Sequence, residues 1–193
     1  TLTGEDGEYQ FTVNATDITD VDGISGIGSK SANWTLDATA PTITELTEIT
    51  NDYRNIPVTN LEISFSEQIN TSTFDFNDLV LTLDGGANLI TNEVTFEQLT
   101  DLTFRINGIS SLQTEEGTYN LTVNGSEIED EAGNTVSNSL SQDWVIDKTP
   151  PSAPTDIIIS SGLTTFDSDN RTNTTNVNIS GSLGETGLTV FLT

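Results

Sequence analysis

Short runs of alternating apolar and polar residues fill the middle of the chain and predict β-strands. The run LEISF at 61–65 puts its apolar side chains on one face, the period of two that a half-buried strand shows. Similar runs follow at 79–83, 94–96, 102–106, 119–123 and 144–146, and DGG at 84–86 predicts a turn. About seven short strands in one stretch of this size predict an antiparallel β-sandwich.

The chain also contains an internal repeat with an offset of 110 positions. Residues 7–41 align without gaps on 117–151, and 14 of the 35 positions are identical. Both copies end in the pattern Trp-x-x-Asp-x-Thr-x-Pro. A repeat of this length is one small domain. We therefore expect the last two strands of one domain at 1–40, a complete domain at 41–148 and the first part of a third at 149–193.

Each copy of the repeat opens with an acidic-x-Gly-x-Tyr-x-apolar run, EDGEYQF at 5–11 and EEGTYNL at 115–121. This is the tyrosine-corner pattern of immunoglobulin-like sandwiches. The usual cysteine position is apolar here and the chain has no Cys, so the core must close without a disulfide. We expect the aromatic residues to pack in cores and the prolines to stiffen the joints between domains. These structural residues are Tyr9, Tyr119, Trp34, Trp144, Pro41 and Pro151.

Three segments resemble the bacterial and archaeal immunoglobulin-like (Big-type) tandem repeats of large cell-surface adhesins, surface-layer proteins and extracellular fibres. They are ISFSEQINTSTFDFNDLVLT at 63–82, EGTYNLTVNGSEIEDEAGN at 116–134 and WVIDKTPP at 144–151. The resemblance covers nearly all of 41–148. It implies an all-β protein of tandem immunoglobulin-like antiparallel β-sandwiches, an extracellular or cell-surface location, and a mechanical or adhesive role without catalysis.

Composition excludes several classes of function. The net charge of −25 argues against binding to nucleic acid or to anionic membranes. No apolar run approaches the roughly 20 residues that span a bilayer, so we expect no membrane-spanning segment. Without Cys or His, the chain lacks thiolate chemistry and the commonest general base. No carboxyl group stands in a setting that should raise its pKa, so we expect no catalytic residue and no enzyme.

Acidic loops make calcium the one cofactor that we expect. Calcium takes six to eight oxygen ligands, and acids gather before the last strand of each repeat, in the joints and in FDSDN at 166–170. A joint carboxylate that faces a loop carboxylate would stiffen the link between domains, and Asp130 with Asp147 is the favoured pair. The alternative is a solvated acidic surface. The candidate ligands are Asp20, Asp22, Asp37, Glu129, Asp130, Asp147, Asp167, Asp169 and Asn170.

Asn-x-Ser/Thr sequons make glycosylation a second candidate modification. Two of them occupy the same place in the repeat, at the outward-facing end of a strand. The abundance of Asn, Ser and Thr offers compositional bias as the alternative. The eight sequons begin at Asn14, Asn33, Asn70, Asn120, Asn124, Asn170, Asn173 and Asn178.

These features leave three hypotheses for function. The first is a structural module of an extracellular fibre or large surface protein, stacked end to end as a semi-rigid rod. The second is an adhesive module that binds a surface glycan or protein through its loops, and the third is an accessory domain of a secreted enzyme. Neither end segment can bury its own apolar face. Either the sequence is a window of a longer tandem chain, or neighbouring copies complete the halves by head-to-tail strand addition.

Overall fold

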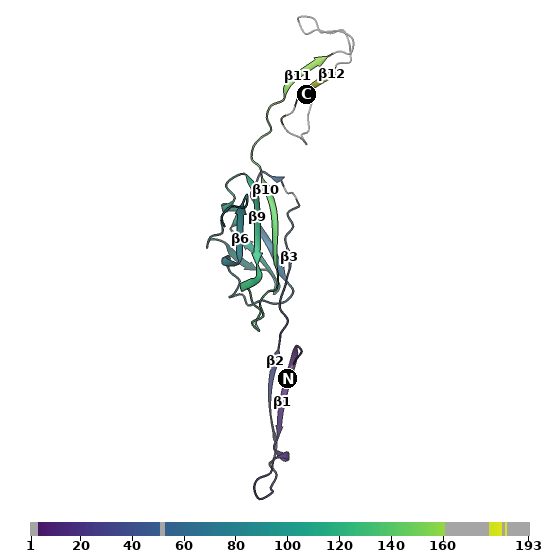
Figure 1. The fold of residues 1–193 in the computed structure, drawn as a ribbon, viewed down its shortest axis with the longest axis vertical. Helices are drawn as coiled ribbons and strands as arrows, with labels where there is room; N and C mark the ends of the chain where they lie inside the picture. Colours follow the sequence, from purple (N-terminus) through teal and green to yellow (C-terminus); the bar gives the residue numbers. More distant parts are fainter. Residues whose placement is uncertain (1–3, 51–52, 161–177, 183, 185–193) are drawn as a thin grey trace. The chain divides into compact units, whose positions relative to one another are not determined.

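A computed structural model describes residues 4–50, 53–160, 178–182 and 184. The chain divides into two compact units, Thr1–Lys148 and Thr149–Thr193, which we consider separately. Among the described residues, the regular elements are β-strands and short 3-10 helices (Figure 1). The all-β prediction is therefore confirmed.

One four-stranded sheet of the first unit has the order β4-β10-β9-β6. The long strands β9 (Gly117–Asn124) and β10 (Ser139–Ile146) pair antiparallel along their whole length. Strand β6 (Leu79–Leu83) pairs antiparallel with the other side of β9. The two-residue strand β4 (Tyr53–Arg54) runs parallel to the end of β10. This parallel edge departs from the purely antiparallel arrangement that the strand pattern predicts.

The second four-stranded sheet has the order β3-β5-β8-β7 and is antiparallel throughout. It consists of β3 (Ile43–Leu46), β5 (Asn60–Phe65), β8 (Thr103–Asn107) and β7 (Thr95–Gln98). In β5 the apolar residues of the LEISF run are all buried, as their alternation predicts. Both sheets contribute to one core, and its largest fully buried side chains include Trp144, Tyr119, Leu61, Ile63, Leu81 and Ile106.

The tight connections follow the local sequence. Asp84 and Gly85, in the predicted DGG turn, have positive φ angles of 51° and 69°, which glycine and aspartate tolerate better than most residues. Gly117, at the start of β9, has a φ of 138° and packs against this turn. A Cβ atom on Gly117 would lie 2.6 Å from Leu83 Cδ1. The positive φ angles of Gly7 and Gly117, 151° and 138°, therefore account for the glycine of the acidic-x-Gly-x-Tyr run in both copies.

A buried amide, Gln113, ties three segments of the complete sandwich together. It follows the 3-10 helix η3 (Ile109–Leu112). Its Oε1 accepts hydrogen bonds from Val58 N and from Trp144 Nε1, both at 2.9 Å. Its Nε2 donates to the carbonyl oxygens of Val58 and Ile109, both at 3.0 Å. The amide thus uses its two acceptor sites and both donor hydrogens, so it fixes the Trp144 ring within the core.

Asp78 contradicts the expectation that no carboxyl group has a raised pKa. It ends the 3-10 helix η2 (Phe76–Asp78) and forms a reciprocal cap with Asp75, whose backbone N donates to Asp78 Oδ2 at 2.8 Å. Burial raises the pKa of Asp78 to about 6. The group accepts a backbone hydrogen bond in a capping box, so we assign it a structural role.

Two further strand pairs lie outside the complete sandwich. Strands β1 (Gly7–Asn14) and β2 (Ser29–Leu36) form an antiparallel hairpin. In the second unit, β11 (Thr155–Ser160) pairs antiparallel with β12 (Asn178–Ser182). These two strands match the strand signals at 157 and 177–179. The third signal expected there, at 188–192, lies outside the described residues.

Candidate functional site: an acidic joint and an open hairpin

The β1–β2 hairpin reproduces the β9–β10 pair residue for residue. Gly7 opposes Leu36, and 110 positions later Gly117 opposes Ile146. In both pairs a tyrosine opposes a tryptophan and the rings stack, with centroids 5.6 Å apart for Tyr9 and Trp34 and 6.0 Å apart for Tyr119 and Trp144. The tyrosine hydroxyl donates to the carbonyl oxygen four residues earlier in each copy. The tyrosine corner therefore forms in the β1–β2 hairpin although, among the described residues, its sheet has only two strands.

The two copies differ completely in burial. Trp144 is 1% exposed, whereas Trp34 is 44% exposed; Leu121 is 0% exposed, whereas Phe11 is 58% exposed. We expected both tryptophans to pack in cores, and Trp34 does not. In the described part of the chain, the β1–β2 sheet contains just these two strands, so no second sheet covers its apolar face.

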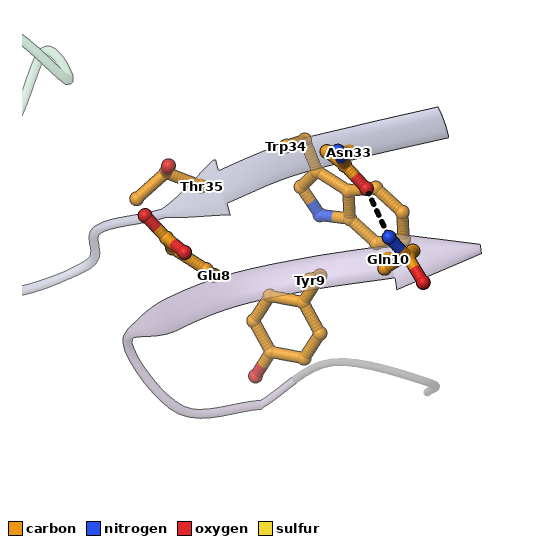
Figure 2. A pocket seen from close by; sticks show the side chains of 6 residues that line it. All are labelled: Glu8, Tyr9, Gln10, Asn33, Trp34 and Thr35. Carbon is orange, nitrogen blue, oxygen red and sulfur yellow. Dashed lines mark hydrogen bonds between the residues drawn. The ribbon is translucent and has the colours of Figure 1, made fainter. Parts of the chain in front are cut away.

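A shallow hollow lies beside the exposed Tyr9–Trp34 stack (Figure 2). Glu8, Gln10, Asn33 and Thr35 complete its lining, and Gln10 Nε2 donates to Asn33 Oδ1 at 3.0 Å. An exposed aromatic stack resembles a sugar-binding platform, but Gln10 and Asn33 are strand neighbours of Tyr9 and Trp34 and so point to the opposite face of the hairpin. The equivalent stack at Tyr119 and Trp144 is buried, so we interpret the Tyr9–Trp34 stack, and not the polar lining of the hollow, as uncovered core.

An acidic residue just before each long hairpin accepts a hydrogen bond from the backbone that leaves the hairpin. Ala38 N donates to Asp6 Oδ1 at 2.7 Å, and Thr39 Oγ1 also donates to Asp6. In the second copy, Lys148 N donates to Glu116 Oε1 at 2.7 Å. Positions 6 and 116 are equivalent in the repeat, as are 38 and 148. The hydrogen bond from Thr39, followed by that from Ala38, lowers the pKa of Asp6.

The same joint is also held by the domain that follows it. Asn134 Nδ2 donates to the carbonyl oxygen of Asp37 at 3.2 Å, and Ser137 N donates to that of Pro41 at 3.0 Å. Asn138 then bonds both the N–H and the carbonyl oxygen of Ile43, at 2.7 and 2.9 Å. Residues 37–39 are therefore bonded on one side to the preceding hairpin and on the other to the following domain.

Three acids meet at this joint. Carboxylate oxygens of Asp37, Glu67 and Asp130 all lie within 4.8 Å of one another. Asp37 directly follows β2, Glu67 follows β5, and Asp130 lies in the loop before β10. Among the described residues, both salt bridges belong to Arg105, which pairs with Glu62 and Glu97. The acidic cluster therefore has no salt-bridge partner in that part of the chain.

The pKa values show two different environments within the cluster. The pKa of Glu67 is raised by partial burial and by the negative charges of Asp37, Asp130 and Asp6. Burial would raise the pKa of Asp130 as well, but hydrogen bonds from Asn134 and Ala132 hold it below its ordinary value. Asp130 is 3% exposed. The cluster thus combines a buried, hydrogen-bonded carboxylate, Asp130, with Glu67, whose negative charge is repelled by the neighbouring acids. A cation that binds oxygen ligands would relieve the repulsion between these carboxylates.

The favoured pair of the sequence analysis, Asp130 with Asp147, is not brought together. The eight-residue strand β10 runs between the loop of Asp130 and Asp147, and a strand advances about 3.3 Å per residue. Asp147 N instead donates to the carbonyl oxygen of Arg54 at 2.8 Å, where β4 meets the end of β10. The joint acid that reaches Asp130 is Asp37, from the joint before the domain and not the one after it.

The other candidate ligands are not part of this cluster. Asp20 occupies the place of Asp130 in the first copy, and its Oδ1 accepts from Asp22 N and Ile24 N at 2.9 Å. Glu129 lies beside Asp130 but outside the three-acid group. Asp167, Asp169 and Asn170 lie outside the described residues. Glu67 was not predicted, because it stands alone in a polar segment after β5 and nothing near it in the sequence points to the joint.

The sequons within the described residues lie on strands or beside them. Asn14 ends β1 and Asn124 ends β9, so the equivalence expected from the repeat is present. Asn33 lies in β2 and Asn120 in β9, where Asn120 Nδ2 donates to Asp143. Asn70 lies in a turn and accepts a hydrogen bond from Ser72 N, and Asn178 begins β12. Asn170 and Asn173 lie outside the described residues.

Helices of the length and apolarity needed to cross a bilayer do not occur among the described residues.

Comparison with solved structures finds similar folds in a surface-layer protein. The N-terminal part of the bacterial S-layer protein SbsC is 19% identical with a TM-score of 0.38, over 61% of this chain and 26% of that chain. The S-layer protein rSbsC(31-844) is 18% identical with a TM-score of 0.37, over 61% and 15%. This chain thus spans about a quarter or less of either.

The family assignment rests on sequence. No curated protein matches the chain. A family model described as the bacterial Ig-like domain matches residues 37–146. That range contains the complete sandwich, the long β9–β10 pair and all three acids of the joint. Because the match covers more than half of the 193 residues, the chain belongs to the bacterial Ig-like domain family.

Proposed function

We propose that this chain is a structural module of an extracellular fibre or large cell-surface protein, in which Ig-like repeats follow one another end to end. The observation that carries this proposal is the equivalence of the two hairpins. They share one register, one tyrosine corner and one acid that holds the outgoing chain. The same strand register and the same contacts therefore recur at the end of both repeats. Successive domains are then connected in the same way.

The joint at residues 37–43 supports a stiff connection. Its backbone is bonded to Asp6 before it and to Asn134, Ser137 and Asn138 after it. Pro41 restricts its own φ and the conformation of the residue before it. Short linkers that are fixed at both ends hold successive domains at a narrow range of angles. The module thus serves as a spacer that projects or connects other parts of a surface protein.

The surface location has a direct test, because the chain contains no Cys. Ala87 lies in an exposed turn after β6, so Ala87→Cys introduces one reactive thiol without touching the core. In the native host, a membrane-impermeant maleimide should label this variant on intact cells. The core variant Leu121→Cys should stay unlabelled until the protein is unfolded, because Leu121 is fully buried. Labelling of Ala87→Cys after lysis alone would exclude a role on the cell surface.

We further propose that calcium binds Asp37, Glu67 and Asp130 and stiffens the joint. Three carboxylates with oxygens within 4.8 Å of one another offer the ligand type that calcium prefers, and nearby carbonyl oxygens and water can complete its coordination. The three ligands come from both sides of the joint. Binding should therefore oppose any movement that separates residue 37 from the following domain.

Calcium should raise the unfolding temperature of the whole 193-residue chain relative to a chelator. At a hundredfold excess over Kd the gain is about 2.7 kcal/mol, and magnesium should give less because it tolerates this geometry poorly. Asp37→Asn should abolish the gain, whereas Asp147→Asn should keep it because Asp147 lies at the other end of β10. In chelator, Glu67→Gln should stabilise the chain by removing a repelled charge, and in calcium it should weaken the gain.

Calorimetry with these variants separates the possible outcomes. A calcium gain that survives Asp37→Asn would show that the ion binds elsewhere. A gain that disappears with Asp147→Asn would restore the pair first expected from the sequence. Equal unfolding temperatures in calcium, magnesium and chelator would make the three acids a solvated surface.

A further inference from the structure

A surface turn at residues 70–73 presents one of the sequons in a fixed conformation. Thr73 N donates to the carbonyl oxygen of Asn70 at 3.0 Å, which closes the turn. Asn70 N donates to the carbonyl oxygen of Glu129 at 2.8 Å, and Glu129 N donates to Thr73 Oγ1 at 3.0 Å. Asn70 is partly exposed, and Thr71 and Ser72 at the tip are exposed. The whole sequon therefore lies at the surface on an anchored turn.

The side-chain amide of Asn70 is polarised by the third residue of its own sequon. Its Oδ1 accepts hydrogen bonds from Ser72 N at 3.1 Å and from Ser72 Oγ at 2.7 Å. Among the described residues, none accepts a hydrogen bond from Asn70 Nδ2. Two donors on the carbonyl oxygen stabilise the negative charge that this oxygen acquires when Nδ2 loses a proton. The amide nitrogen is therefore unoccupied and prepared to attack an electrophilic carbon.

We propose that Asn70 is a glycan attachment site, with a sugar diphosphate as the donor and a glycosyltransferase as the enzyme. The lone pair of Asn70 Nδ2 forms a bond to the anomeric carbon of the sugar. The bond from that carbon to the diphosphate oxygen breaks, and its electron pair leaves with the diphosphate. Nδ2 gives one proton to a base of the transferase. The product is a sugar joined to the amide nitrogen of Asn70.

The two sequons inside strands lack this combination of features. Asn120 Oδ1 accepts from Thr122 Oγ1 at 2.9 Å, but Asn120 Nδ2 donates to Asp143. Its backbone lies in β9, which has a neighbouring strand on each side. Asn33 lies within β2, and its Oδ1 accepts from Gln10 Nε2. A transferase would have to open a paired strand to reach either asparagine.

The two sequons that the repeat relates, at Asn14 and Asn124, are also less prepared. Asn14 makes no side-chain hydrogen bond to the 3-10 helix that it precedes, η1 (Ala15–Asp17). Asn124 Oδ1 accepts from Ser126 N at 3.2 Å and from Ser139 Oγ at 3.4 Å, so the hydroxyl of its own sequon is not one of the donors. The geometry thus distinguishes Asn70 from sequons that an abundance of Asn, Ser and Thr creates by itself.

The glycosylated turn would lie beside the acidic joint. Ile69 forms a β-bridge with Asp130, and Glu67 lies three positions before Asn70. A glycan on Asn70 uses no carboxylate of the three-acid cluster, so this proposal goes beyond the calcium site and does not depend on it. At this place the glycan should hinder proteases from reaching the connection between the hairpin and the sandwich.

Mass spectrometry of the chain purified from its native host tests the proposal. Cleavage after Glu67 and Asp75 releases residues 68–75, a peptide that contains one sequon. We expect this peptide to carry a sugar mass that fragmentation places on Asn70, and we expect Asn120 to be unmodified. An unmodified 68–75 peptide would overturn the proposal. A sugar found as often on Asn120 as on Asn70 would overturn the structural selection.

Matched variants separate loss of the site from loss of the fold. Asn70→Asp removes Nδ2 but keeps an oxygen that accepts from Ser72, so the turn should form and the 68–75 peptide should lose its sugar. Ser72→Ala should also abolish the modification, and Ser72→Thr should restore it because it returns the hydroxyl. Sugar that persists on this peptide in Asn70→Asp would place the modification on another residue. If Ala87→Cys is labelled on intact cells while Asn70 is unmodified, this proposal fails and the proposed function stands.

Discussion

Replacing Trp144 with alanine should lower the free energy of unfolding of the complete domain by about 3–5 kcal/mol, whereas Trp34→Ala should change it by less than about 0.5 kcal/mol. Both substitutions remove the same side chain from equivalent positions of the repeat. At position 144 the ring is buried, stacks on Tyr119 and donates to Gln113. Its loss leaves a large cavity and removes one of the two donors to Gln113 Oε1. At position 34 the ring lies outside the core.

Urea unfolding of the 193-residue chain, followed by circular dichroism, measures both variants in the same background. Each variant serves as the control for the other, since Trp144→Ala and Trp34→Ala have the same amino-acid composition. A loss of several kcal/mol in Trp34→Ala would show that the hairpin contributes to the folding of residues 41–148. A loss below about 1 kcal/mol in Trp144→Ala would be far smaller than buried tryptophans normally give.

Gln113→Leu should destabilise the same domain by about 3–4 kcal/mol, although leucine has a similar size and is more apolar. The substitution removes the acceptor for Val58 N and Trp144 Nε1 and the donor for two carbonyl oxygens. Buried polar groups that lose their partners each cost about 1–3 kcal/mol. The gain from burying an apolar side chain offsets part of this loss.

Gln98→Leu is the matched control, because Gln98 is exposed in the edge strand β7. It makes the same chemical change where water satisfies the amide, and it should leave the urea midpoint almost unchanged. The double variant Gln113→Leu with Trp144→Phe should lose less than the sum of its single variants, because both remove one shared hydrogen bond. Additive losses would argue against the amide as the centre of this network.

Most strands of the sandwich could be predicted from the sequence because their burial alternates. The LEISF run lies in β5 with its three apolar residues buried, and the runs at 79–83 and 119–123 lie in β6 and β9. The equivalence of the two hairpins also followed from the alignment of the repeat. Strand β4 was missed because two residues are too few to show a period.

The sequence predicts an acidic site at a joint, but it does not identify all the residues that form the site. The sequence predicts that a joint acid faces the loop of Asp130, and it favours Asp147 as that acid. The structure pairs the loop with Asp37, since the loop lies where the chain enters the domain and Asp147 where it leaves. Glu67 and Gln113 gave no local signal, because their partners are distant in the sequence and polar residues surround them.

The placement of the joint contacts also bears on how the gene can change in length. Residues 37–146 include Asp37, Glu67, Asp130 and the loop that forms hydrogen bonds to residues 41–43. This range has the same length as the offset of the repeat. Duplication of these residues in tandem would place a new Asp37 where Asp147 stands, followed by its own loop. Unequal recombination between repeats can therefore add or remove one whole domain while every joint keeps its contacts.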